Sequence, residues 1–189
     1  MSENFQDKSI EYYQQSSLYE YIEEDHPMMR LARRAAIKYS LTPTFPIGVI
    51  IVNDGEVISE SANGNGYHEK NLNTPGHRGG CIRRYISKER EKKGEPKLKS
   101  GEGFELCPGC STDYHAEARA IAETKDKSKL RGAELFMYGH WWCCKDCWDK
   151  MNAVGIKKVY AIEKFRDKKF QKKWVEEFKK ERACQKNIK

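Results

Sequence analysis

Hydrophobic residues along the chain alternate between a helical and a strand-like spacing. Between residues 28 and 39 they recur on one helical face, and Asp25 followed by Pro27 is a typical signal for the start of a helix. Residues 46–52 form a short, almost wholly apolar run rich in β-branched side chains, as in a buried strand. The apolar pattern resumes after a turn sequence at residues 53–55, so the two runs predict a β-hairpin.

The second half of the chain alternates in the same way. The pattern predicts an alanine-rich helix over 115–123, a strand over 134–138, a helix over 144–153, a strand over 157–162 and an amphipathic helix over 168–185. Alternating strands and helices predict a layered α/β sheet, parallel where a helix crosses over and antiparallel in the first hairpin.

Two segments do not follow these patterns. Residues 1–24 are polar and tyrosine-rich, and we expect a loosely packed N-terminal arm. Residues 64–113 form a polar insert that is too long for an ordinary connection between elements, and such segments are functional or disordered. A length of 189 residues suits one compact domain, which we expect over 25–165, with 166–189 as a helix packed on it or extending it.

Composition and charge restrict the possible environment. No apolar stretch approaches the roughly 18 residues of a membrane span, and the first residues lack the apolar segment of a secretory signal, so we expect a cytoplasmic protein. Residues 157–189 contain 13 Lys or Arg and 5 Asp or Glu, so the net charge of +7 comes from the tail. Nucleic-acid binding by this helix is one interpretation, and a solvated charged face is the other.

Cysteines suggest metal chemistry. Six of the seven lie between residues 81 and 147, and they include two C-x-x-C pairs. In a reducing compartment, this clustering favours metal ligands over disulfides.

Two motifs at predicted helix starts carry candidate chemistry. His115 and Glu117 begin one helix, and Cys144 and Cys147 begin the next. The N-termini of successive crossover helices meet at the carboxyl edge of a sheet, so the motifs can converge. One histidine and two cysteines leave one position of a tetrahedral zinc site open, as in catalytic sites. Glu117 lies two residues from the histidine, points elsewhere and is free to move protons.

H-x-E followed by P-C-x-x-C is the signature of zinc nucleobase deaminases. Here Cys143 occupies the proline position, so the ligand is Cys143 or Cys144, and we favour Cys144 because only it forms C-x-x-C with Cys147. From about residue 28 to 164 the chain resembles the deoxycytidylate deaminase family. The resembling segments are 32–40, 46–52, 61–64, 81–83, 100–107, 115–121 and 153–159. The insert is longer, and the carboxyl helix more basic, than this family leads us to expect.

The resemblance implies a three-layer α/β/α fold and hydrolytic removal of the cytosine 4-amino group of a free nucleotide, dCMP giving dUMP and ammonia. It implies that zinc is bound by three ligands, His115, Cys144 and Cys147, and that Glu117 is the proton shuttle. Substrate contacts are expected from Asn63, Arg83, Ala116 and Phe165, and Arg84 or His68 is a further candidate for a 5′-phosphate. A homo-oligomer is also implied.

Alternatives remain open at this level. A cytosine or adenine deaminase acting on single-stranded DNA or RNA would use the basic tail to attract phosphates. A non-catalytic zinc-stabilised binding module would use the four cysteines of both C-x-x-C pairs and would leave Glu117 without a role. The insert offers a second, structural zinc site built from Cys81, Cys107 and Cys110, with His77 or His68 as the fourth ligand.

Overall fold

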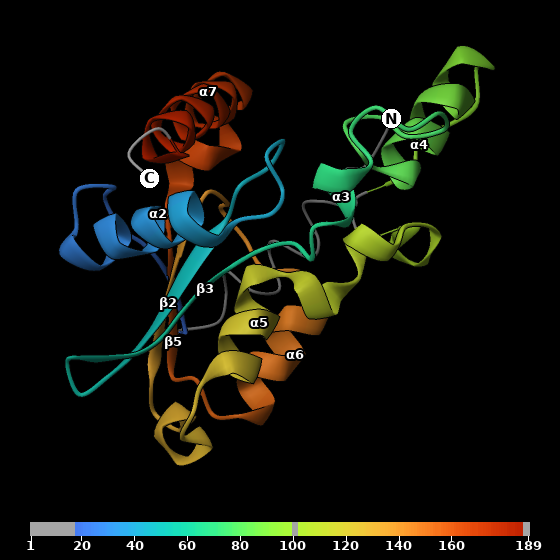
Figure 1. The fold of residues 1–189 in the computed structure, drawn as a ribbon. Coiled ribbons are helices and arrows are strands. Elements are labelled where there is room, and N and C mark those ends of the chain that lie inside the picture. Colours follow the sequence, from blue (N-terminus) through green and yellow to red (C-terminus); the bar gives the residue numbers. More distant parts are fainter. Residues whose placement is uncertain (1–17, 100–101, 187–189) are drawn as a thin grey trace.

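A five-stranded mixed sheet forms the centre of the molecule in the computed structural model, which describes residues 18–99 and 102–186. The strand order is β1-β5-β4-β2-β3 (Figure 1). The strands are β1 (Tyr19–Tyr21), β2 (Gly48–Asn53), β3 (Glu56–Ala62), β4 (Glu134–Tyr138) and β5 (Lys158–Ala161). β2 pairs antiparallel with both β3 and β4, whereas β5 pairs parallel with β4 and β1. The predicted α/β class is confirmed.

Helices cover both faces of this sheet (Figure 1). One face carries α2 (Pro27–Tyr39) and α7 (Lys168–Lys186), and the other carries α5 (Ala116–Glu123) and α6 (Lys145–Ala153). Alternate residues of the central strand β2 serve the two cores, because Val49 and Ile51 pack toward α5 and α6 while Ile50 and Val52 pack toward α2 and α7. The fold therefore has three layers.

Close packing of α2 on the sheet depends on small residues. A Cβ atom at Gly48 would lie 2.1 Å from the carbonyl oxygen of Ala32 and 2.3 Å from the amide of Ala36, so only glycine fits. The helix begins at Pro27, and the ring of His26, rather than the expected Asp25, caps it by accepting a hydrogen bond from Met28 N at 3.2 Å.

The basic helix α7 packs on α2. Trp174 and Phe178 are buried in this core, and the Trp174 indole N–H donates to the carbonyl of Pro46 at 2.9 Å. Arg33 on α2 pairs with Glu177 and Glu181 of α7, so part of the acidic content of this helix is used internally.

The N-terminal segment is more ordered than a loose arm in its described part. Strand β1 pairs parallel with β5, and residues 1–17 lie outside the described range. The hydroxyl groups of Tyr19 and Tyr21 both donate to the carbonyl oxygen of Trp141, at 2.7 and 3.1 Å. Strand β1 is thereby tied to the loop that leads into α6.

The polar insert folds into short helices that stand away from the sheet (Figure 1). They are α3 (Tyr67–Lys70), α4 (Ile82–Lys92) and the single turns η1 (Phe104–Leu106), η2 (Pro108–Cys110) and η3 (Thr112–Tyr114). Two further turns, η4 (Lys127–Leu130) and η5 (Glu163–Arg166), flank β4 and α7. No residue of α4 is buried, so this helix is not held by an apolar core.

Candidate active site

His115, Cys144 and Cys147 come together at the N-termini of α5 and α6, which lie side by side. His115 and Cys144 are the N-cap residues of these helices, and Cys147 lies in the first turn of α6. The His115 Nδ1 atom is 3.5 Å from the sulfur atom of each cysteine. The H-x-E and C-x-x-C motifs therefore converge in space as the topology predicted.

This arrangement fits a zinc ion. In a tetrahedral site with Zn–S near 2.3 Å and Zn–N near 2.0–2.1 Å, the sulfur and nitrogen ligands lie about 3.6 Å apart. The observed 3.5 Å separations match that value. The described part of the chain offers three ligand atoms here and no fourth, as in catalytic zinc sites.

The thiols of Cys144 and Cys147 have pKa values that are shifted in opposite directions. A hydrogen bond from Cys147, and next one from His115, lowers the pKa of Cys144 to about 5 against the opposing effect of burial. The same contact with Cys144 raises the pKa of Cys147. The lowered pKa favours the thiolate form of Cys144, which is the form that binds metal ions.

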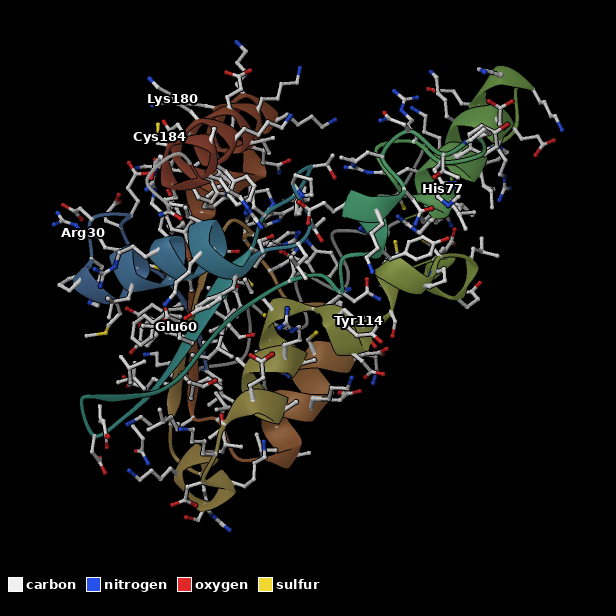
Figure 2. The ribbon with its side chains drawn as sticks, viewed as in Figure 1. Arg30, Glu60, His77, Tyr114, Lys180 and Cys184 are labelled. Carbon is white, nitrogen blue, oxygen red and sulfur yellow. The ribbon has the colours of Figure 1, made fainter. Side chains whose placement is uncertain are left out.

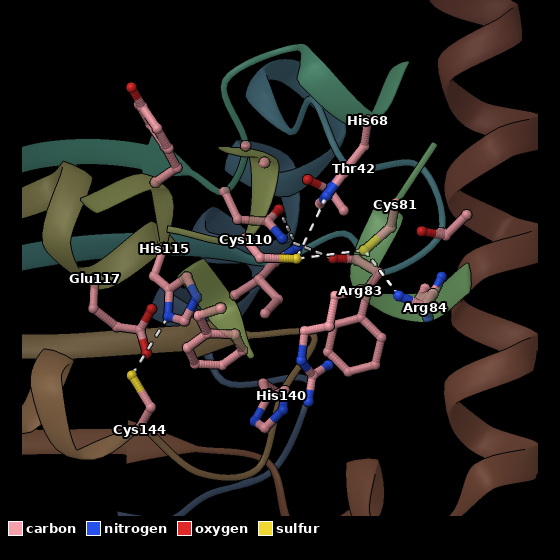
Figure 3. Close-up of a pocket in the computed structure, with 18 of the residues that line it drawn as sticks. Thr42, His68, Cys81, Arg83, Arg84, Cys110, His115, Glu117, His140 and Cys144 are labelled. Atoms are coloured by element: carbon pink, nitrogen blue, oxygen red, sulfur yellow. Dashed lines mark hydrogen bonds between the residues drawn. The ribbon is translucent and has the colours of Figure 1, made fainter. Parts of the chain in front are cut away.

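Glu117 lies behind His115 on the first turn of α5, with its side chain in the cavity (Figure 3). Its residue is only 4% exposed, and burial raises the pKa of the carboxyl group. Burial, and next the charge of the nearby Glu117 carboxyl group, raises the pKa of the Cys143 thiol. Cys143 is buried in the core and is outside the ligand group, so Cys144 is the cysteine that accompanies His115 and Cys147.

A cavity of about 260 Å³ opens in front of these groups. Its wall includes several aromatic rings and one amide, from Phe45, Asn63, Phe104, Tyr114, His140 and Trp142. These rings come from the loop before β2, the insert and the loop after β4. The shape and lining suit a flat, polar ring such as a nucleobase.

Asn63 lines this cavity but is largely occupied by the protein itself. Its Oδ1 accepts from Ser40 Oγ at 2.7 Å and from Ile47 N at 3.0 Å, and its Nδ2 donates to Phe45 O at 2.8 Å. These bonds fix the loop that carries Phe45. One amide hydrogen of Nδ2 is left for a ligand.

The other expected substrate contacts fall in different places. Phe165 is fully buried against Tyr138 and Phe170 and does not line the cavity, so the expected substrate contact from Phe165 is wrong. The short turn η5 directs this ring under α7 and away from the pocket. Ala116 has its methyl group in the core, so only its backbone, in the first turn of α5, is available to a ligand.

Arg83 lines the cavity, yet its guanidinium group serves the insert. It donates to the backbone carbonyls of Glu102 and Lys99, and it lies over the Phe104 ring with 5.2 Å to the centroid. The neighbouring Arg84 also lines the cavity, and its guanidinium group has no hydrogen bond or ion pair within the described residues. Arg84 is therefore the freer cation at this wall.

The sequence analysis missed His140, which follows the carboxyl end of β4. The backbone amide of Trp142 donates to its Nδ1 at 3.2 Å, so the proton resides on Nε2. Its ring stacks on Trp141 with centroids 4.4 Å apart, and burial lowers the pKa to about 3. His140 is thus a neutral hydrogen-bond donor in the cavity wall. Its position at the carboxyl edge of the sheet was the available signal.

A second group of possible metal ligands lies in the insert, and three of its four members line the same cavity. It consists of His68, Cys81, Cys107 and Cys110, whose ligand atoms all lie within 4.8 Å of one another. Figure 3 shows His68, Cys81 and Cys110 on a different side of the cavity from His115 and Cys144. The cysteines of the two C-x-x-C pairs are therefore in separate groups, and the four-cysteine site considered above does not form.

His77 is not part of this group. Of the two histidines considered as the fourth ligand, His68 is the one that lies beside the three cysteines. The His77 Nε2 atom is 3.1 Å from the Tyr67 hydroxyl, and its Nδ1 atom is 3.1 Å from the carbonyl of Pro75, so both ring nitrogens have partners outside the cysteine cluster. The seventh cysteine, Cys184, is exposed on α7 and lies far from both groups (Figure 2).

The three-layer α/β/α fold, with one histidine, two cysteines and a buried carboxyl group at adjacent helix starts, fits a zinc-binding domain. The sequence matches the family model for the cytidine and deoxycytidylate deaminase zinc-binding region over residues 22–163, and the chain belongs to this family. This membership supports zinc-dependent deaminase activity.

A search of curated proteins returned no match. Within the described residues, no helix is both long and apolar enough to cross a bilayer.

Proposed function

We propose that the protein removes the 4-amino group of cytosine from a free nucleotide by hydrolysis, with dCMP as the substrate and dUMP and ammonia as products. The observation that carries this proposal is the buried carboxyl group of Glu117 beside a three-ligand set for zinc in an aromatic cavity. His115, Cys144 and Cys147 would hold the ion. When bound, zinc lowers the pKa of a coordinated water molecule to near 7 and so supplies a nucleophile at neutral pH.

Glu117 is the residue that moves protons in this scheme. Its carboxylate accepts a proton as water attacks C4 of the base, and passes it to the ring nitrogen N3. It then accepts the second proton of the former water molecule from the new hydroxyl group at C4 and passes it to the amino nitrogen. The C4–N bond breaks as the C4=O bond forms, and ammonia leaves. The raised pKa of Glu117 brings its proton affinity closer to that of the groups with which it exchanges, the condition under which general acid–base catalysis is efficient.

The cavity wall supplies orientation for the base. Phe45, Phe104 and Trp142 offer ring surfaces, and the Nε2–H of His140 is a donor suited to the O2 carbonyl of a pyrimidine.

Recognition of the 5′-phosphate is assigned to Arg84 rather than to Arg83. Arg84 lies between the cavity and an adjoining surface hollow that also carries Arg78 and Lys88. Its guanidinium group can bind a phosphate with two parallel hydrogen bonds. The basic helix α7 contributes no residue to the cavity, which favours a free nucleotide over a nucleic-acid strand.

A substrate panel tests the proposal. Purified protein is incubated with cytidine, deoxycytidine, CMP, dCMP, dCTP, single-stranded DNA and single-stranded RNA, and ammonia and the uracil product are measured. The highest kcat/KM is expected for dCMP. Activity on single strands alone would favour the nucleic-acid alternative, and no ammonia from any compound would favour a binding module.

Arg84→Ala isolates the phosphate contact. A charged hydrogen-bond pair is worth about 1.5–3 kcal/mol, so kcat/KM for dCMP should fall about 10- to 100-fold while that for deoxycytidine is retained. Arg30→Ala is the matched control, because Arg30 is an exposed arginine on α2 that does not line the cavity. Equal losses for nucleotide and nucleoside would show that Arg84 has a different role.

A further inference from the structure

The insert has almost no buried side chains apart from one cluster. Among its described residues, 64–99 and 102–113, the buried positions are four glycines together with His68, Cys81 and Cys107. The fourth member of the cluster, Cys110, is partly buried beside them. A segment of this length cannot offset its conformational entropy by burying glycine, so something else must hold it.

The cluster has the geometry of a closed tetrahedral site. Cys81 and Cys110 have their sulfur atoms 3.4 Å apart, and the His68 Nε2 atom is 3.5 Å from the sulfur of Cys107 and 3.6 Å from that of Cys110. Tetrahedral zinc places paired sulfurs about 3.8 Å apart and sulfur–nitrogen pairs about 3.6 Å apart. All these thiols are free, so disulfides do not hold the insert.

Backbone packing preserves this geometry. A Cβ atom at Gly109 would lie 2.5 Å from His68 Nε2, and one at Gly80 would lie 1.8 Å from the His68 carbonyl oxygen. Both glycines therefore permit the ring of His68 to reach the sulfur atoms. The Cys81 sulfur also accepts from the backbone amide of Arg84 at 3.5 Å and so caps α4.

We propose that His68, Cys81, Cys107 and Cys110 bind a second zinc ion in a closed, structural site, and that this ion is the core of the insert. All four tetrahedral positions are filled by protein ligands, so the ion offers no open position for chemistry. Its role is to fix one wall of the cavity and, through the Cys81 cap, the first turn of α4. The proposal does not depend on deaminase activity.

Metal counting on the whole protein tests this site. The full chain is purified without chelator from zinc-supplemented cells, and zinc and sulfur are measured together by elemental mass spectrometry. About two zinc ions per chain are expected, one for each group of ligands. The double variant Cys107→Ser/Cys110→Ser should retain about one, as should Cys144→Ser, which keeps only the insert site. His77→Ala is the matched control and should retain two.

Two variants keep every ligand in place and avoid a large loss of folding. Gly109→Ala adds one methyl group against His68 and should lower the zinc content toward one. Gly76→Ala, where an added Cβ meets no atom within 4 Å but φ is +76°, strains the backbone of the insert without touching the ligands and should retain two zinc ions. Cobalt(II) loaded into Cys144→Ser should show thiolate-to-cobalt absorption from the insert site alone. In the Cys107→Ser/Cys110→Ser protein, limited proteolysis should cleave within 64–113 first.

One zinc ion in the unaltered chain, unchanged by the Cys107→Ser/Cys110→Ser replacement, would overturn the second site. So would a Cys144→Ser protein without thiolate-to-cobalt absorption. A chain with two zinc ions that releases no ammonia would retain the second site and reject the proposed function, so the two can fail separately.

Discussion

Replacing Glu117 by glutamine separates chemistry from structure at the centre of the cavity. Glutamine has nearly the same size, but it cannot move a proton. The carboxyl group is buried and its pKa is raised by burial, so the folded state disfavours its charged form. A neutral amide removes that cost. The variant should therefore be as stable as the parent or more stable.

The expected loss of activity follows from the role of the residue. General acid–base catalysis contributes about 10²- to 10⁴-fold, which corresponds to about 3–5 kcal/mol of activation free energy. Most of this loss should appear in kcat, because Glu117 acts on the reacting atoms and the aromatic walls still bind the base. The zinc content should stay the same, since Glu117 is not among the grouped ligand atoms.

The assay combines three measurements on one preparation: ammonia release with dCMP, zinc per chain and Tm. Glu117→Ala serves as a second variant that also removes the side-chain volume. Turnover within tenfold of the parent, with zinc retained, would refute the proton-shuttle role. A large fall in Tm together with zinc loss would instead indicate that the carboxyl group is structural.

Further predictions concern the ligands, the core and the cavity wall. Cys144→Ser should lose the catalytic zinc, whereas Cys143→Ser should keep it. If metal analysis gives the opposite result, Cys143 is the zinc ligand and Cys144 is not. Phe178→Ala, which empties a fully buried position, should lower the free energy of unfolding by about 3–5 kcal/mol in urea titrations, while Lys180→Ala on the same helix should change it by less than about 0.5 kcal/mol. Asn63→Ala leaves the Ser40 hydroxyl and two backbone groups unpaired and should raise KM more than it lowers kcat; unchanged kinetics would remove Asn63 from the wall.

The sequence predicted the elements whose signal lies in their own periodicity. The strand at Glu134–Tyr138 and the helix that ends at Glu123 were expected within one residue of their observed bounds. The grouping of His115 with the C-x-x-C pair was also accessible, because the order of strands and helices places both motifs at one sheet edge. Strand β1 was missed, since three residues are too few to show a pattern and its pairing with β5 is long-range.

The residues of the insert were harder to assign for a physical reason. His68 and His77 are both near Cys81 in sequence, and only the path of the chain through turns decides which ring faces the sulfur atoms. Arg83 and Arg84 are consecutive on a helix and so point about 100° apart, and the phase of α4 is set by the Cys81 cap rather than by periodicity. The conformation of the insert depends on individual side-chain contacts, and such contacts produce no periodic hydrophobic pattern from which it could be predicted.

The tyrosine contacts of β1 bear on how the protein can be shortened. The family match begins at residue 22, one position after this strand ends, so a chain trimmed to the shared region would discard Tyr19 and Tyr21. Their hydroxyl groups hold the carbonyl of Trp141, three residues before Cys144. A fragment that begins at residue 22 would therefore lack the two hydrogen bonds that hold the loop before Cys144. Weak zinc retention in such a fragment would be a result of the truncation and would not describe the full chain.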